Sequence, residues 1–300
     1  YEYSYEYPYH DRYERTFYGF EIVTTKQVDY SSATKALYRK TVDQYNNHDF
    51  LFKGLQLKST VYDAAGNIYQ EMVNTYDRKE ITTGNIIPAG QEYCYTTNYP
   101  AISAIDKYFY KGDGSTTAEI HTRQEFYHGP YGNVKEVRDL RDMNSNTDDD
   151  VYSYISYAAG TPLASNLLSL VTDISIKGAP TGPILRQRTA AYNALGLQTE
   201  MNIINSSGNS EYDFQYDAYG NMTQIMMPEN VNIERMTYNY AYDNVVYTFP
   251  TSITDALGNT STTSYDYRLG APLSTTDITG NTIAYDYYSD GRLYTVTGPN

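Results

Sequence analysis

Four histidines, one cysteine and a short acidic run are the residues of this 300-residue chain whose types could most readily do chemistry. The histidines share no metal-ligand spacing, so we expect structural or surface roles for His10, His48, His121 and His128. Cys94 stands alone, so it can form no disulfide within the chain and is expected to be an inert buried thiol. A hard cation could bind the carboxylates of Asp148, Asp149 and Asp150. The run lacks the alternating ligand spacing and fixed glycine of a calcium-binding loop, which favours a solvated loop.

Motifs of the common catalytic centres do not occur in the sequence. There is no Gly-x-Ser-x-Gly, no His-Glu-x-x-His and no Cys/His pair in a recognisable context. Carboxylate pairs abound in a chain with 36 acidic residues, so a glycosidase is not excluded by counting, but nothing singles one pair out. Gly112-Asp113-Gly114 lacks the strand and helix that flank phosphate-binding loops, so we expect a hairpin turn there. The sequence therefore predicts a protein that is not an enzyme, with no cofactor and no metal site.

Charge and hydropathy limit the classes of partner that the chain could bind. The formal net charge of −14 argues against nucleic acid, which requires a basic patch. No run approaches the length of a membrane-spanning helix, and no signal peptide is visible. The chain opens on Tyr1 rather than Met, so we expect its natural start, with any export signal, to lie outside the sequence.

Tyrosine dominates the aromatic residues, with 37 Tyr against 8 Phe and no Trp. Its ring packs on half-buried pleated surfaces while its hydroxyl reaches water or a hydrogen-bond partner, so wide sheets with wet faces are expected rather than a dry core. At the start of the chain the tyrosines alternate with polar residues, which in a strand places all of them on one face: Tyr1, Tyr3, Tyr5, Tyr7 and Tyr9. The same alternation recurs along the sequence, for example at Tyr93 and Tyr95 and at Tyr238, Tyr240 and Tyr242. It predicts an all-β fold.

Two segments leave the type of element open. Residues 32–46 could carry a helix or two strands, because Lys40-Thr41-Val42 is strand-like. Residues 162–171 could form a short helix or a buried strand.

A Tyr-Asp pair followed by a glycine-centred turn recurs along the chain. In full or variant form it occurs at Tyr62, Asp63 and Gly66; at Tyr216, Asp217 and Gly220; at Tyr265, Asp266 and Gly270; and at Tyr285, Asp286 and Gly291. A second form lacks the tyrosine and occurs at Asp255 and Gly258 and at Asp277 and Gly280. Tyr265 and Tyr285 are 20 residues apart, which is the length of two short strands and two tight turns.

The residue types explain the turn. Asp at its entrance can accept backbone N–H bonds, Gly supplies a positive φ, and the Asn that often follows tolerates the exit. Tyr before Asp lies at the end of a strand, where its ring can cover the turn. One such unit buries too little surface to fold alone, so neighbouring units must pair edge to edge.

These turns resemble RHS/YD repeats. Such repeats occur in bacterial RHS proteins, in the B and C components of insecticidal Tc toxins and in animal teneurins. The segment from Glu14 to Phe20, Glu-Arg-Thr-Phe-Tyr-Gly-Phe, is similar to a segment of Tc toxin B components and SpvB-like proteins. Phe52 to Ser59 and Phe249 to Asp255 resemble later parts of the same proteins, in the same order. The repeats are irregular before residue 200, and the core motif that closes the shell in these families is absent.

The resemblance implies antiparallel strand-turn-strand units that form an extended curled sheet, part of a hollow shell. Residues 1–185 would be an irregular Tc toxin B-like region and residues 186–300 the YD-repeat region. The shell would belong to a secreted or surface-exposed bacterial protein and enclose a C-terminal effector. Expected partners are the remainder of the polypeptide, the effector cargo and, in a Tc-type assembly, the C-type and A-type subunits. A carbohydrate-binding or adhesion module that uses tyrosine-lined faces is the alternative, and a hydrolase is a third hypothesis.

Overall fold

The computed structural model describes residues 1–31, 35–91, 97–144, 149–159, 166–232 and 234–299. These residues form twenty β-strands and one short 3-10 turn at Pro130–Gly132, so the predicted all-β class is confirmed. The contacts divide the chain into two units: residues 1–156 with 174–185 (unit 1), and residues 157–173 with 186–300 (unit 2). In the described ranges no helix is long and apolar enough to cross a membrane.

Unit 1 is an antiparallel meander in which each strand pairs with the next one along the chain. Its strands are β1 (Glu2–Asp11), β2 (Thr16–Asp29), β3 (Ala36–Asn46), β4 (Leu55–Tyr62), β5 (Ile68–Glu80), β6 (Asn98–Phe109), β7 (Ile120–His128), β8 (Val134–Asp142) and β9 (Val151–Tyr157). β10 (Val171–Lys177) follows in the sequence.

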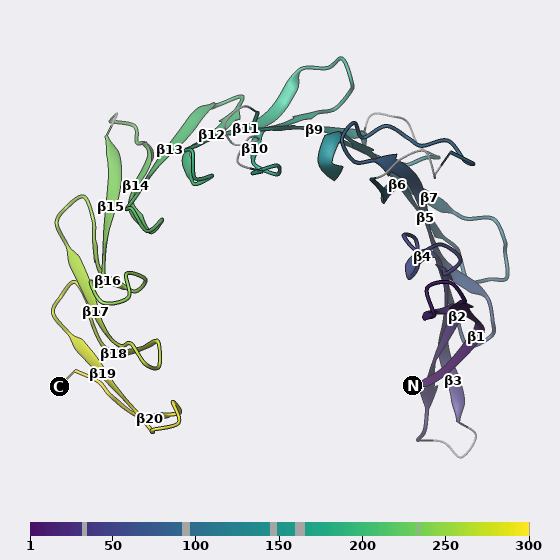
Figure 1. The fold of residues 1–300 in the computed structure, drawn as a ribbon, viewed down its shortest axis with the longest axis horizontal. Coiled ribbons are helices and arrows are strands. Elements are labelled where there is room, and N and C mark those ends of the chain that lie inside the picture. Colours follow the sequence, from purple (N-terminus) through teal and green to yellow (C-terminus); the bar gives the residue numbers. More distant parts are fainter. Residues whose placement is uncertain (32–34, 92–96, 145–148, 160–165, 233, 300) are drawn as a thin grey trace. The chain divides into compact units, whose positions relative to one another are not determined.

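Unit 2 repeats the meander with shorter strands (Figure 1). Its strands are β11 (Ile184–Tyr192), β12 (Gln198–Asn205), β13 (Gly208–Tyr216), β14 (Met222–Glu229), β15 (Arg235–Tyr242), β16 (Pro250–Thr254), β17 (Thr260–Asp266), β18 (Ala271–Thr276), β19 (Thr282–Tyr287) and β20 (Leu293–Thr297).

The segments that the sequence left open are resolved in part. Residues 36–46 form the single strand β3, which pairs along its length with β2 and β4. Two backbone ladders outweigh the weak helical pattern of this segment. Asn166 to Leu170 form no helix, and Val171 begins β10. Residues 162–165 lie outside the described residues, as do Tyr93, Cys94, Tyr95 and Asp148.

The sheet of unit 2 has two chemically different faces. Residues that pair across an antiparallel ladder share a face, and residues two apart along a strand share it as well. One face therefore collects the apolar pairs Phe214↔Ile225 and Tyr240↔Ile253. The opposite face carries polar cross-strand hydrogen bonds: Gln224–Asn239 at 2.9 Å, Ser264–Ser274 at 2.7 Å and Thr276–Thr282 at 2.8 Å.

Buried apolar side chains are scarce, as the tyrosine-rich composition predicts. In the described part of the chain they are Tyr18, Ile87, Ala101 and Ala104, all in unit 1. Most strand residues are half-buried, because neighbouring side chains on the same face cover one another. The fold is therefore stabilised by backbone ladders, turns and lateral side-chain contacts more than by a dry core.

Candidate functional site

The turn after β13 shows how the repeated Asp-x-x-Gly-Asn sequence folds. The Asp217 carboxylate accepts the backbone N–H groups of Tyr219 and Asn221 on Oδ1, both at 2.9 Å. Its Oδ2 accepts the Asn221 side-chain amide at 2.9 Å. Gly220 has a φ of +88°, a conformation that side chains with a Cβ rarely adopt. One carboxylate thus fixes both ends of the turn, and the next strand starts in register.

The same carboxylate–Asn geometry occurs at three other predicted turns. Asp63, Asp255 and Asp277 each accept the backbone N–H and the side-chain amide of the Asn four residues later, at 2.8–3.1 Å. Each glycine of these turns donates its N–H to the carbonyl of the Asp, at Gly66, Gly258 and Gly280. The turn after β11 has the same shape with an amide in place of the acid: Asn193 Oδ1 accepts the N–H groups of Leu195 and Leu197 at 3.0 Å.

Two predicted turn acids are placed differently. Asp266 is the last residue of β17; its backbone carbonyl accepts the N–H of Gly270 at 2.8 Å, and its carboxylate binds Arg268. Asp286 lies inside β19 and accepts the Thr295 hydroxyl at 2.8 Å, so it does not form the turn. That turn instead runs from Tyr288 to Arg292 through Gly291, with Asp290 binding Arg292. Tyr285 lies opposite Val296 in the ladder.

The turn aspartates link stability to acid pH. Hydrogen bonds from the Asn67, Asn221 and Asn259 side chains lower the pKa of Asp63, Asp217 and Asp255, and those from Thr279 and Asn281 lower the pKa of Asp277 to about 2. A lowered pKa contributes stability above the ordinary value of 3.8 that is lost as pH falls toward the folded-state pKa. We expect the melting temperature to fall between about pH 4 and pH 2.

The substitution Asp277→Asn isolates this contribution. Asn193 shows that an amide holds the turn, so the variant should fold and lose one titrating group. Its melting temperature, followed by circular dichroism, should be lower at pH 7 and fall less than that of the wild type between pH 4 and pH 2.5. Equal slopes for the two proteins would contradict the linkage.

A row of tyrosine hydroxyls joins neighbouring strands of unit 2. The last or last-but-one residue of every second strand from β11 to β19 is a tyrosine whose hydroxyl donates to the carbonyl of the first or second residue of the preceding strand. The pairs are Tyr192–Val171 (2.8 Å), Tyr216–Gln198 (2.7 Å), Tyr242–Met222 (3.0 Å), Tyr265–Pro250 (3.0 Å) and Tyr287–Pro272 (2.9 Å). In unit 1, Tyr76 bonds to the Gln56 carbonyl at 3.2 Å. Each repeat is thus fastened to the one before it.

The ladder shifts register immediately before these tyrosines, for instance between Gln215 and Tyr216 and between Ala241 and Tyr242. The extra residue of each shift lies in the following strand, Thr223 and Thr251 in these two cases, whereas the tyrosine hydroxyl donates to a carbonyl of the preceding strand. Burial also raises the pKa of Tyr192, Tyr216 and Tyr242. Tyr62 follows a similar shift at the end of β4, where the Lys40 ammonium lies 4.2 Å from its ring centroid.

The substitution Tyr216→Phe tests this role of the hydroxyl. It should lower the free energy of unfolding by about 1 kcal/mol, because the Gln198 carbonyl loses its donor. Tyr212→Phe is the matched control, since Tyr212 lies in the same strand, on the same face, and its hydroxyl bonds to no described residue. Urea denaturation should separate the two variants; equal losses would show that the hydroxyl of Tyr216 is unimportant.

Asp243 is a turn residue that the glycine-centred pattern does not predict. It is 4% exposed, and five backbone N–H groups of its loop donate to its carboxylate. Those of Val245, Val246 and Tyr247 reach Oδ1 at 2.6–3.1 Å, and those of Thr248 and Phe249 reach Oδ2 at 2.8–2.9 Å. Burial raises the pKa, but these donors together lower it well below the usual range. The Tyr242-Asp243 pair was the available sequence signal.

Three of the four histidines and Asp150 of the acidic run have partners within the fold; His48 Nε2 lies 2.5 Å from Glu21 Oε1. His121 Nε2 lies 2.7 Å from Asp106 and its ring stacks on Tyr108, while His128 Nε2 lies 2.8 Å from the Ile102 carbonyl. His10 lies in β1. Asp150 is buried and accepts the Tyr152 hydroxyl at 3.1 Å. In the described ranges no three His, Cys, Asp or Glu side chains form a group that could hold a metal ion.

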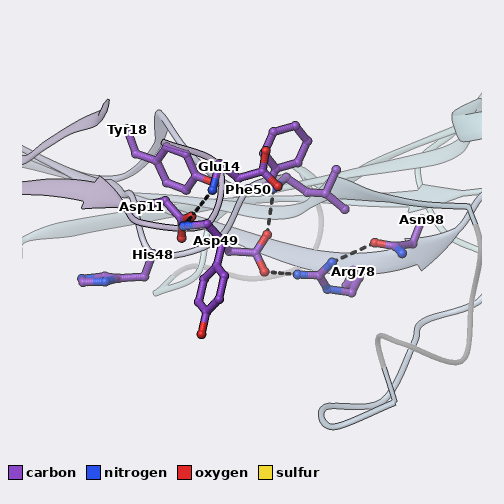
Figure 2. Close-up of a pocket in the computed structure, with 10 residues that line it drawn as sticks. Asp11, Glu14, Tyr18, His48, Asp49, Phe50, Arg78 and Asn98 are labelled. Atoms are coloured by element: carbon purple, nitrogen blue, oxygen red, sulfur yellow. Dashed lines mark hydrogen bonds and ion pairs between the residues drawn. The ribbon is translucent and has the colours of Figure 1, made fainter. Parts of the chain in front are cut away.

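A cleft of about 710 Å³ in unit 1 is the second candidate site (Figure 2). It lies at the β1–β2 and β3–β4 loops, which contribute Glu14, Asp49 and Phe50, and at Asp11 of β1 and Tyr18 of β2. Asp49 forms an ion pair with Arg78 of β5, and Arg78 donates to Asn98 Oδ1 at 2.8 Å. No motif in the sequence marks this cleft, although the segment from Glu14 to Phe20 contributes to it.

Comparison with known proteins gives a likeness of fold. No protein-family model and no curated protein matches the sequence. A crystal structure of TcdB2-TccC3 without its hypervariable C-terminal region is similar over 99% of this chain, with a TM-score of 0.71 and 13% identity. The Tc holotoxin pore of Photorhabdus luminescens is similar over 98%, with the same TM-score and identity. The chain spans about a fifth of the length of these solved chains, 21% in each case.

Proposed function

We propose that this chain is a segment of the wall of a hollow shell in a bacterial protein of the Tc/RHS class, and that the shell encloses an effector domain. The observation that carries the proposal is the likeness of nearly the whole chain to TcdB2-TccC3 at a TM-score of 0.71. The YD-like turns and the segment from Glu14 to Phe20 support the same class from the sequence side.

The wall role is passive and needs no reacting group. Strands of unit 2 pair with their chain neighbours, and the turn carboxylates and tyrosine hydroxyls hold one repeat to the next. The two faces of unit 2 would then present different surfaces to the interior and exterior. Burial of the effector behind such a wall would keep it from solvent and from host proteases until release.

The proposed partners, regions, location and lack of catalysis follow from this role. The partners would be the rest of the same polypeptide, the effector and, in a Tc-type assembly, the C-type and A-type subunits. Residues 186–300 would be the YD-repeat region and residues 1–185 the irregular Tc toxin B-like region. The protein would be secreted or displayed on the bacterial surface, and it would not be an enzyme.

Protease protection tests the container role. The polypeptide that carries this chain together with its C-terminal region should be digested with a nonspecific protease at neutral pH. The C-terminal region should survive intact in the wild type and be cleaved at least tenfold faster in Asp243→Ala, which removes the acceptor that organises the β15–β16 loop. Equal cleavage of the C-terminal region with and without this chain would refute the proposal.

A carbohydrate-binding module remains the second candidate because one aromatic pair is exposed. Tyr219 and Tyr247 stack with ring centroids 4.2 Å apart and are 63% and 41% exposed. Flat exposed rings of this kind can stack on sugar faces. Micromolar binding to one glycan on an array, abolished by Tyr219→Ala, would favour this role over a purely structural wall, and an array without specific binding would exclude it.

A further inference from the structure

Two rings that line the cleft of unit 1, those of Tyr18 and Phe50, already contact a cation of the chain itself. The Lys53 ammonium lies 4.6 Å from the ring centroid of Tyr18 and 4.0 Å from that of Phe50. The two rings are 6.5 Å apart and inclined at 61°. Aromatic faces at this distance attract ammonium and guanidinium groups through the ring quadrupole. The two rings therefore form a cation-binding wall that a tethered lysine occupies.

The carboxylates of the cleft add negative charge beside this wall. Asp11 Oδ1 accepts the N–H groups of Tyr13 and Glu14 at 2.9 and 2.7 Å, and Asp49 is paired with Arg78 (Figure 2). In the described structure no hydrogen bond or ion pair engages the carboxylate of Glu14. Burial, followed by the charges of Asp11 and Glu14, raises the pKa of the Tyr18 hydroxyl. Asp11, Glu14 and Asp49 thus bring three carboxylates to the cleft.

The loop that carries Phe50 is preorganised. Asn47, which is 1% exposed, donates through Nδ2 to the Phe20 carbonyl at 2.7 Å and accepts the Gly54 N–H on Oδ1 at 3.0 Å. This residue ties the loop that carries Phe50 and Lys53 to strand β2. A Cβ at Gly19 would lie 3.4 Å from Asn47 Nδ2, so the strand approaches the loop closely. A ligand would meet rings and carboxylates that are already positioned.

We propose that this cleft binds a lysine or arginine side chain of a basic peptide segment from a partner protein, with Lys53 as a tethered competitor. The incoming cation would lie against Tyr18 and Phe50 and pair with Glu14. A volume of about 710 Å³ accommodates a short peptide stretch rather than one side chain alone. The inference does not depend on the wall role, because it rests only on contacts within unit 1.

Fluorescence anisotropy of a labelled Gly-Lys-Gly-Lys-Gly peptide against the intact chain tests the proposal. Lys53→Ala should tighten binding about threefold or more, because the competing ammonium is gone. Glu14→Gln should weaken binding about threefold, and Phe50→Leu should weaken it by a similar factor. The same peptide with norleucine in place of lysine should not bind.

Two variants control for the overall negative charge of the chain. Lys111→Ala and Glu119→Gln change the net charge by the same amounts as Lys53→Ala and Glu14→Gln, in an exposed pair that does not line the cleft. The proposal is overturned if Lys53→Ala binds no more tightly than Lys111→Ala. It is also overturned if Glu14→Gln binds as well as Glu119→Gln, since attraction would then be nonspecific. Phe50 is exposed, so a folding defect should not obscure the result for Phe50→Leu.

Discussion

Asp243→Ala should lower the melting temperature of unit 2 by about 8 °C or more, the largest effect of any substitution at a turn aspartate in the described chain. Five backbone N–H groups lose their acceptor at once, and in the wild type these are satisfied by one buried carboxylate. A donor left without a partner inside a folded loop costs the full desolvation of that group. The β15–β16 loop, including Tyr247 at its tip, should therefore lose its order.

The melting temperatures of a graded series of variants at neutral pH show whether the effect is specific to Asp243. Asp255→Ala removes a carboxylate that holds only a short exposed turn, so its melting temperature should fall much less. Asp243→Asn should lie between the two, because the amide oxygen can serve one side of the loop while the NH₂ faces the N–H groups of the other. Hydrogen exchange of residues 244–249 would localise the loss. A melting temperature for Asp243→Ala equal to that of Asp255→Ala would contradict the account.

The strand class could be predicted from sequence because it depends on local alternation. In the segment from Arg235 to Tyr242, rings at every second position predict a strand without reference to any distant residue, and the structure places β15 there. Residues 32–46 were ambiguous for the opposite reason. There the pairing with β2 and β4 decides the outcome, and pairing is a property of the neighbours.

The turns likewise include some that the local sequence predicts and some that it does not. Asp217 and Asn221 are four residues apart, so their hydrogen bonds are implied by a short sequence. Asp286 has a similar local sequence, yet it faces Thr295 in the next strand because the turn begins two residues later. Nothing in residue types alone separates these outcomes, since a shift of one residue moves a side chain to the other face of the sheet.

Contacts that bridge strands lay beyond local reasoning. The Tyr216 hydroxyl reaches a carbonyl 18 residues earlier, at the start of the preceding strand β12. Likewise, the cleft of unit 1 brings the β1–β2 loop against a loop more than 30 residues further on. A tyrosine-rich composition predicts that hydroxyls need partners, but the identity of the partners depends on strand order and bulges.

Gly84→Ala should destabilise unit 1 by about 3–5 kcal/mol, close to or beyond what the fold tolerates. A Cβ at this position would lie 2.3 Å from the carbonyl oxygen and 2.5 Å from the carbonyl carbon of Gly129, and neither is a flexible side-chain atom. Gly84 also has a φ of +73° and presents its own carbonyl to the Lys79 ammonium at 3.2 Å. The loop after β5 could escape the clash only by moving away from the loop after β7, which would break the bond from the Tyr131 N–H to the Ile81 carbonyl.

Gly66→Ala separates the two causes in that prediction. Gly66 has a φ of +90°, but a Cβ there would meet nothing within 4 Å, so only the backbone conformation is penalised. Its cost should be about 1–2 kcal/mol. Urea denaturation gives the loss in free energy of unfolding for each variant. The difference between the two losses is the cost of the close backbone contact at Gly84. If both lost the same stability, the positive φ would explain everything, and the close approach of the two loops would contribute nothing to the fold of unit 1.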